Sequence, residues 1–294
     1  MTNAVKSNTT GICNKKIRTS DIVLKVLIYL SAILAITLLV GIMGYVFVRG
    51  IPQINWEFLS TVQSAKKGTF GILGNIVITL YIITITLIIA APVGIGSAIY
   101  LNEYARPGKL VNLIAFTTEV LAGIPSIIFG LFGMVFFGTT LGLGYSVLTG
   151  SFTLTLMVLP LITRNTQEAL KTVPDSYRSG ALGIGATKWY MIRTILLPSA
   201  APGILTGIIL SIGRIVGESA ALLFTAGSGF LLAKNMFSKL FESSGTLTIQ
   251  LYLSMQKAKY DQAFGIAVVL LLIVLGINLL TKYLTGKFDV TKLK

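Results

Sequence analysis

Apolar residues run along this chain in six long stretches, separated by short polar segments. The stretches cover about residues 22–48, 72–101, 111–138, 146–165, 195–226 and 263–284. A helix needs roughly 20 predominantly apolar residues to cross the hydrocarbon core of a bilayer. The pattern therefore predicts an all-α integral membrane protein with six transmembrane helices. Glycines interrupt the third and fourth stretches, so their ends are the least sharply defined.

Composition and charge agree with a membrane protein and give it an orientation. Hydrophobic residues make up 54% of the 294 residues and charged residues 12%, against roughly 25% charged in a soluble domain. Of the 24 Lys and Arg residues, sixteen fall in the segments that are inside if the N-terminus is cytoplasmic. Seven fall in the outer segments, and Arg214 lies within a span. This bias predicts that both termini are cytoplasmic.

The net charge of +14 is explained by this topology, in which basic residues on the inner side contact anionic lipid. Because the basic residues are dispersed over several loops, we expect no nucleic-acid partner. The first stretch is too long for a signal peptide and is predicted to be a retained anchor. The chain has no His and a single Cys, Cys13, so neither an intramolecular disulfide nor a His metal site is expected.

The polar segment between the fourth and fifth stretches has an unusual arrangement of small residues and prolines. Pro174 stops the fourth helix, residues 176–182 suit a short helix, and glycines at 183 and 185 permit a sharp turn. Thr187 suits the N-cap of a second short helix through Trp189–Met191. Pro198 and Pro202 are predicted to mark the start of the fifth span. From these residues alone, a surface for a partner and an ordinary connector are equally good interpretations.

The spacing in this segment resembles the EAA loop of ATP-binding-cassette (ABC) importer permeases, in which Glu-Ala-Ala precedes a glycine and Ile-x-Leu-Pro. The matching positions here are Ser179, Gly180, Ala181, Gly185, Ile195, Leu197 and Pro198. Serine thus stands at the family's glutamate, and only the last alanine is kept. The resemblance implies that the segment is a coupling helix, which docks into a cleft on a separate ATPase subunit.

The fifth stretch carries two opposite charges, Arg214 and Glu218, four residues apart. In one continuous helix they would share a face and neutralise each other. Charges at bilayer depth cost roughly 3 kcal/mol or more unless they are paired or hydrated. One interpretation is an ion pair that locks the bundle. The other is a substrate site, because an arginine binds an oxyanion through two hydrogen bonds. The spacings Gly203/Gly207 and Gly213/Gly217 are predicted to allow close helix approach.

The segment Arg-x-x-Gly-Glu-Ser-Ala at 214–220 resembles the PstA-type permeases of phosphate importers. So does Leu-Ala-Gly-Ile-Pro-Ser-Ile-Ile-Phe-Gly-Leu-Phe-Gly at 121–133. The likeness covers about residues 70–284 and implies the type I ABC importer permease architecture. It implies an anion-handling role for Arg214 and Glu218, with Arg164 as a weaker pathway candidate. Glu119 and Asn75 are polar groups in other spans, for which hydrogen bonds within the bundle are the better explanation.

The resemblance also implies a domain organisation. We expect a cytoplasmic tail at 1–21, an anchor helix at 22–48, a permease domain at 70–284 that includes the coupling loop 164–198, and a tail at 285–294. The outer segment 227–262 suits a short re-entrant or surface helix, either as a docking site or as a cap on the bundle.

The expected function is a permease subunit of an ATP-driven phosphate importer. It implies a second permease (PstC-type), two ATPase subunits (PstB-type) and an external phosphate-binding protein (PstS-type). The chain has no phosphate-binding loop of the Gly-x-x-x-x-Gly-Lys-[Ser/Thr] kind. No cofactor is therefore expected in it, and ATP and Mg²⁺ would bind to the partner ATPase. The alternatives are a permease for another oxyanion, such as sulfate or molybdate, and a stand-alone secondary transporter or channel.

Overall fold

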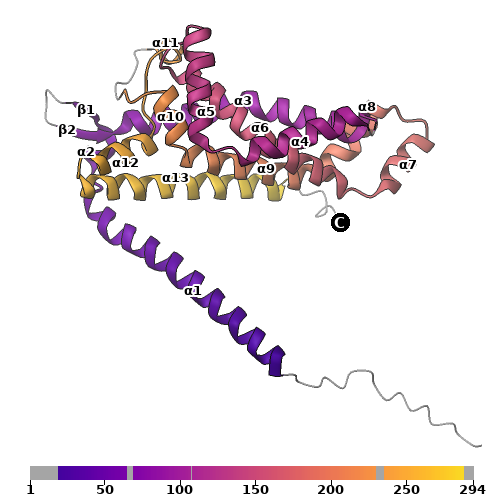
Figure 1. Ribbon diagram of the computed structural model, residues 1–294, viewed down its shortest axis with the longest axis horizontal. Coiled ribbons are helices and arrows are strands. Elements are labelled where there is room, and N and C mark those ends of the chain that lie inside the picture. Colours follow the sequence, from indigo (N-terminus) through magenta and orange to yellow (C-terminus); the bar gives the residue numbers. More distant parts are fainter. Residues whose placement is uncertain (1–18, 65–68, 107, 230–234, 288–294) are drawn as a thin grey trace, which may run out of the picture. The chain divides into compact units, whose positions relative to one another are not determined.

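The computed structural model describes residues 19–64, 69–106, 108–229 and 235–287, and the chain divides into two units, 1–48 and 49–294. Helices make up nearly all of the regular structure (Figure 1). The single sheet in these described ranges is an antiparallel pair, β1 (Val62–Ser64) and β2 (Thr69–Ile72). The predicted all-α class is thus confirmed.

The first unit consists of most of α1 (Thr19–Gly50), a 32-residue helix. Its side chains are apolar on every face. Apolar residues such as Ile28, Leu34 and Ile42 are each more than half exposed. A helix that is apolar all round suits a lipid environment. The predicted anchor helix at 22–48 lies within it.

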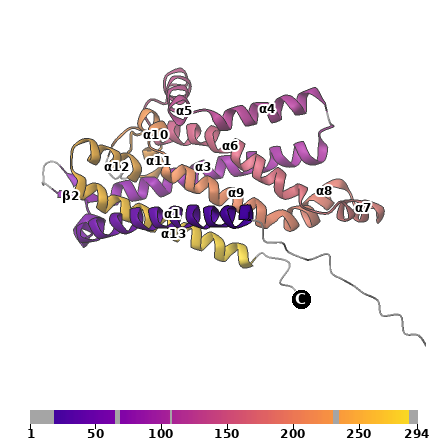
Figure 2. The ribbon, with the colours of Figure 1, turned by 60° about the horizontal axis from the view of Figure 1, so that its bottom comes forward.

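The second unit is built around four long helices. They are α3 (Leu73–Ile99), α6 (Val147–Lys171), α9 (Leu197–Gly217) and α13 (Tyr260–Lys287). Helix α6 packs along both α3 and α9 (Figures 1 and 2). Leu154 and Met157 of α6 are fully buried in one cluster with Ile82 of α3 and Ile215 of α9. In a bilayer such contacts stabilise the bundle through close packing, because lipid tails are as apolar as the side chains.

Two of these helices are extended by π-helical turns at the same end of the unit. Helix α3 continues as η2 (Tyr100–Tyr104), and α9 is preceded without a break by α8 (Lys188–Met191) and η4 (Ile192–Leu196). The helical stretch of the fifth span thus begins at Lys188, ten residues before Pro198. The prediction that the prolines mark the start of this span was wrong. Pro198 therefore lies inside a continuous helical stretch, directly after the π-helical turn η4.

The third predicted span is broken rather than continuous. Helix α4 (Lys109–Gly123) and helix α5 (Ser126–Gly133), with its π-helical continuation η3 (Met134–Thr140), meet at an angle of 103°. The bend falls at Ile124 and Pro125. Ile124 is extended, with φ −71° and ψ 131°, because a proline disfavours the helical region for the residue before it.

Among the described residues, five helices are long and apolar enough to span a membrane, and the bent α4–α5 pair makes six if it is one span. The structure therefore agrees with the six predicted spans if the bent α4–α5 pair is counted as the third span.

At the end of the unit away from η2, short elements cover the bundle. They are η1 (Ile51–Gln53), α2 (Trp56–Ser60), the hairpin, α10 (Ala220–Thr225), α11 (Met236–Lys239) and α12 (Leu247–Gln256). The predicted short helix within 227–262 is α12, and Leu247 and Ile249 at its start are buried. Residues 230–234 of this segment lie outside the described residues.

Candidate functional site

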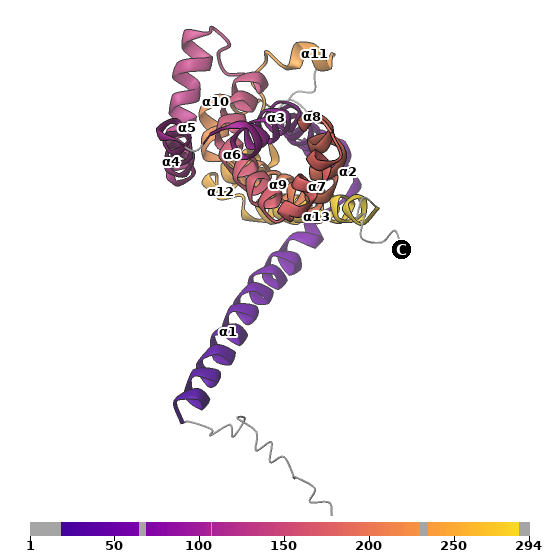
Figure 3. The same cartoon turned by 90° about the vertical axis from the view of Figure 1, so that its right-hand side faces the viewer.

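The inner loop forms the predicted helix, turn and helix. Helix α7 spans Asp175–Gly183, and α8 begins after Thr187, whose hydroxyl accepts a hydrogen bond from the Tyr190 N–H at 3.3 Å. Both helices lie at the end of the second unit opposite the hairpin (Figure 1). Seen from that end, α3, α6 and α9 lie together behind α7 and α8 (Figure 3). The local signals in the sequence therefore predicted this part of the fold correctly.

Gly185 is required by the way α7 ends. Its φ is +83°, in the region that disfavours side chains. The Gly185 N–H donates to the Leu182 carbonyl at 3.0 Å, and the Ala186 N–H donates to the Ala181 carbonyl at 3.0 Å. This pair of bonds is a Schellman motif, which satisfies carbonyls that the helix end leaves free. The glycine of the loop pattern thus sets the turn between α7 and α8.

The other positions of the loop pattern divide between packing and exposure. Ala181 is buried, and Ile195 and Leu197 are half-buried against the cluster formed by the inner ends of α6 and α9. Pro198 is also half-buried. Ser179 and Gly180 are exposed. The Ser179 hydroxyl, at the family's glutamate position, donates to the Asp175 carbonyl of its own helix at 3.1 Å.

The loop exposes an apolar surface, which we call the loop tip. It consists of Tyr177, Leu182, Ile184, Trp189 and Tyr190. Ile184 is 86% exposed and the other four are 50–60% exposed. A contiguous exposed apolar surface with polar neighbours is typical of an interaction site. The loop tip is therefore a candidate interaction surface.

Arg178 is a residue of the inner loop, outside the loop tip, that the sequence did not single out. Its guanidinium makes five hydrogen bonds: two to Glu103 Oε1 at 3.1 and 3.3 Å, and one each to the Leu170 carbonyl, the Val173 carbonyl and Asp175 Oδ1 at 2.9 Å. An arginine has five N–H donors, so every one is used. The signal available in the sequence was an acid, Glu103, at the end of an apolar stretch.

The charges in the fifth span do not share a helix face. Helix α9 ends at Gly217, and Glu218 is extended, with φ −80° and ψ 122°. Glu218 Oε1 accepts from the Ala221 N–H at 3.0 Å, and the Glu218 carbonyl accepts from the Thr248 hydroxyl at 3.0 Å. The predicted placement on one helix face was wrong, because α9 ends before Glu218 and the Glu218 carboxylate bonds instead to the first turn of the separate helix α10.

Arg214 lies in the last turn of α9 and is half-buried. Within the described ranges, its guanidinium forms no ion pair with Glu218 or with any other carboxylate. It is close to the helix end, since only three residues of α9 follow it. A cation is favoured at a helix C-terminus by the helix dipole. Arg214 therefore offers an uncompensated positive charge near the break between α9 and α10.

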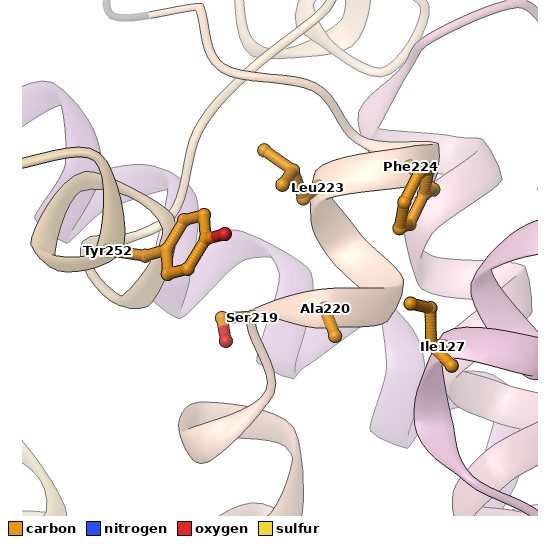
Figure 4. Close-up of a pocket in the computed structure, with 6 residues that line it drawn as sticks. All are labelled: Ile127, Ser219, Ala220, Leu223, Phe224 and Tyr252. Carbon is orange, nitrogen blue, oxygen red and sulfur yellow. The ribbon is translucent and has the colours of Figure 1, made fainter. Parts of the chain in front are cut away.

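A small cavity of about 180 Å³ opens beside this break. Its lining consists of Ile127, Ser219, Ala220, Leu223, Phe224 and Tyr252 (Figure 4). Tyr252 of α12 and Ile127 of α5 lie on either side of α10. The lining is mostly apolar, with hydroxyls from Ser219 and Tyr252, so the cavity itself supplies no charge for an anion.

The remaining polar candidates lie apart from Arg214. Arg164 and Glu119 are exposed side chains. Asn75 is buried and donates to the Gly245 carbonyl at 2.8 Å, which confirms its predicted role as a hydrogen bond within the bundle. No cluster of three potential metal ligands occurs in the part of the chain that the structure describes.

One of the two glycine spacings in α9 works as predicted. A Cβ at Gly203 would lie 2.5 Å from the Ala169 Cβ, and one at Gly207 would lie 2.7 Å from the Asn165 Cβ, so these glycines let α9 approach α6. For Gly213 and Gly217, no described atom lies within 4 Å of such a Cβ. The prediction of close approach was wrong for this second pair within the chain.

The chain resembles known transport proteins along most of its length. It is 38% identical over 198 residues to the probable ABC transporter permease protein YqgI of Bacillus subtilis (strain 168), which covers 67% of each chain. It is 31% identical over 259 residues to the phosphate transport system permease protein PstA of Mycobacterium leprae (strain TN), which covers 85% of this chain and 84% of the relative.

A solved structure has the same fold. The crystal structure of a bacterial alginate ABC transporter in complex with an alginate pentasaccharide-bound periplasmic protein contains a chain that matches with a TM-score of 0.70. The identity is 16%, and the match covers 92% of this chain and 96% of that one.

Residues 90–290 match the sequence profile of a family described as the binding-protein-dependent transport system inner membrane component. Members of this family are non-enzymatic membrane subunits that work with an ATPase and a substrate-binding protein. The match covers more than half of the chain. This chain is therefore a multi-pass membrane protein of the binding-protein-dependent ABC importer permease family.

Proposed function

We propose that this chain is the permease subunit of an ATP-driven importer of inorganic phosphate. It forms half of the translocation pathway, and a related PstC-type permease forms the other half. Two PstB-type ATPase subunits bind ATP and Mg²⁺ on the cytoplasmic face, and an external PstS-type protein delivers phosphate. The observation that carries this proposal is the likeness to a phosphate transport permease along 85% of the chain.

Arg214 is the residue we assign to the anion. It is half-buried next to the break between α9 and α10 and has no carboxylate partner in the described ranges. A guanidinium binds an oxyanion through two parallel N–H donors. Glu218 stands four positions away, but its carboxylate is bonded to the Ala221 N–H. In this proposal Glu218 shapes the pathway by fixing the start of α10, and Arg214 supplies the charge.

The loop tip is the surface we assign to the ATPase. Ile184 is its most exposed residue, at 86%, which favours insertion into an apolar cleft. An Ile184→Asn chain is expected to insert normally but to co-purify with far less ATPase than the parent. If Ile184→Asn retains the full amount of ATPase, the loop tip is not the docking surface.

Uptake by Arg214 variants tests the anion assignment. The assembled complex in lipid vesicles, loaded with ATP on the ATPase side, would be assayed for uptake of labelled phosphate. Loss of a charge-assisted bidentate contact in Arg214→Gln should lower uptake by about ten- to a hundredfold. Arg214→Lys should also be impaired, since an ammonium lacks the planar fork. Wild-type uptake in both variants would remove Arg214 from the pathway, and loss of assembly in both would make it a structural helix-end charge.

A further inference from the structure

The inner ends of three helices meet at a single buried ion pair. The Arg178 side chain is 19% exposed and the Glu103 side chain 5% exposed. Arg178 belongs to α7, and Glu103 belongs to η2, the π-helical end of α3. For comparison, the neighbouring pair Lys171–Glu168 on α6 is 60% and 65% exposed. Exposed pairs of that kind contribute little, whereas a buried pair with two charge-assisted hydrogen bonds, here both to Glu103 Oε1, fixes geometry.

The same guanidinium also caps the end of α6. Its Nη2 donates to the Leu170 carbonyl and its Nη1 to the Val173 carbonyl, both at 2.9 Å. Leu170 lies in the last turn of α6, where its carbonyl also accepts from the Val173 N–H at 3.3 Å, and Val173 lies just beyond the end of the helix. Carbonyls at a helix end lack the full set of partners within the helix. Asp175, the first residue of α7, accepts from Nη1 as well. Arg178 therefore joins α6, α7 and α3 through one planar group.

The three helices depend on this group to different degrees. Helix α7 is linked to α6 by the three residues 172–174 and to α9 through α8 and η4. Its link to α3 is noncovalent. It includes the Arg178–Glu103 pair and apolar packing of Ile95 and Ile99 on the inner cluster. Helix α8 adds the Lys188 ammonium, 4.9 Å from the centre of the Tyr104 ring in η2. The ion pair is thus the directional part of the contact between the loop and α3.

The end of α3 is a segment in which a fixed contact matters. Residues Tyr100–Tyr104 form a π-helical turn, and η4 forms another at the start of α9. Single π turns inside α-helices occur frequently at functional sites and at helix bends. Glu103 lies inside η2, and its Oε1 also accepts from the Asn102 side-chain amide at 2.7 Å. The Asn102 amide thus holds the same carboxylate oxygen that Arg178 binds.

We propose that Arg178 is a positioning residue that fixes the loop helix α7 to the inner end of α3. A displacement of α7 by the ATPase then moves α3 together with α6 and α9. This inference rests on the proposed function, in which the ATPase drives the permease through the loop. Arg178 acts through Glu103 and touches neither phosphate nor ATP.

The first measurement is the amount of phosphate taken up per ATP hydrolysed by the assembled complex. Arg178→Lys keeps the charge but cannot make five hydrogen bonds, and Glu103→Gln keeps the acceptor oxygen but removes the charge. Both variants are expected to retain ATP hydrolysis, because the loop tip is unchanged. Phosphate uptake per ATP should fall about tenfold in each, within the range for residues that carry coupling between sites. Lys171→Gln, at the exposed pair, is the matched control and should leave the ratio unchanged.

The second measurement reads the position of α7 without any substrate. Spin labels at Tyr100→Cys on η2 and Ser176→Cys on α7, with Cys13→Ser, report the distance between these elements in the complex. The parent should give one narrow distribution that is the same with and without ATP. Arg178→Lys should give a broad distribution or one that changes with ATP. If the parent complex fails to transport phosphate, the proposed function alone is overturned. The distance measurement still tests the positioning role in that case.

Two outcomes would overturn the inference. One is an unchanged uptake ratio together with an unchanged distance distribution in both Arg178→Lys and Glu103→Gln. The other is a purely structural effect, in which assembly, hydrolysis and uptake all fall in proportion and the ratio of uptake to hydrolysis stays at the parent value.

Discussion

Gly183 and Gly185, two residues apart in the inner loop, have different reasons to be glycine. Gly185 has a φ of +83° and forms the turn after α7. Gly183 is the last residue of α7, and its backbone is helical. A Cβ at either position would meet no described atom within 4 Å. The difference between them is therefore one of backbone conformation and not of space.

This pair gives a prediction with a built-in control. Gly185→Val should cost about 1–3 kcal/mol, because a β-branched residue is strained at positive φ. The Schellman turn should distort, the loop tip should lose its arrangement, and phosphate uptake should fall while the chain still inserts. Gly183→Ala should be neutral or slightly stabilising, by about 0.5 kcal/mol. Thermal unfolding of the purified chain and uptake in vesicles check both, and normal coupling in Gly185→Val would exclude a docking role for this turn.

At the scale of elements, close helix packing depends on glycine contacts that the sequence motif only hinted at. In the segment 121–133, a Cβ at Gly130 would lie 2.8 Å from the Ala221 Cα, so α5 and α10 touch through their backbones. A Cβ at Gly123 would meet no described atom within 4 Å. Because α5 and α10 line the cavity beside the α9–α10 break, this contact holds the neighbourhood of Arg214.

The contact predicts unequal effects of two identical changes. Gly130→Ala should destabilise the second unit by about 1–3 kcal/mol, since the added methyl group meets backbone that cannot rotate away. Gly123→Ala should change stability by no more than about 0.5 kcal/mol. Unfolding midpoints in one detergent would compare them. Equal midpoints for the two variants would mean that α5 and α10 do not pack through Gly130.

Local signals predicted the inner loop well, and long-range contacts account for what was missed. The Thr187 cap and the turn at Gly185 depend on residues within five positions, so the sequence was sufficient. The end of α9 at Gly217 depends on Glu218, whose carbonyl is bonded to Thr248, 30 residues away. The Arg178–Glu103 pair joins residues 75 positions apart. Apolar periodicity carries no information on such contacts. Pro125 could have indicated the bend, but it lies within an apolar run that was predicted as one continuous span.

At the scale of the whole molecule, the orientation in the membrane is set by charge. The excess of Lys and Arg in alternate segments predicts that the inner loop and both termini face the cytoplasm, and that 50–70 and 227–260 face outward. In the structure, the inner loop and α12 lie at opposite ends of the second unit (Figure 1). This arrangement agrees with the inner loop and α12 facing opposite sides of the membrane.

Labelling of single cysteines tests the orientation. With Cys13→Ser, an impermeant thiol reagent should reach Lys257→Cys, exposed after α12, from outside intact cells. It should reach Ser176→Cys, exposed on α7, only after the cells are opened. Labelling of Lys257→Cys from the inside alone would reverse the topology and remove the loop from the ATPase side.

The measurement that tests the central claim most directly is ATP hydrolysis by the assembled complex in vesicles, with its external binding protein, in the presence of phosphate or of sulfate. A phosphate importer should hydrolyse ATP faster with phosphate and accumulate it inside, whereas sulfate should leave hydrolysis at the basal rate. Stimulation by sulfate and none by phosphate would contradict the account and assign the chain to another oxyanion.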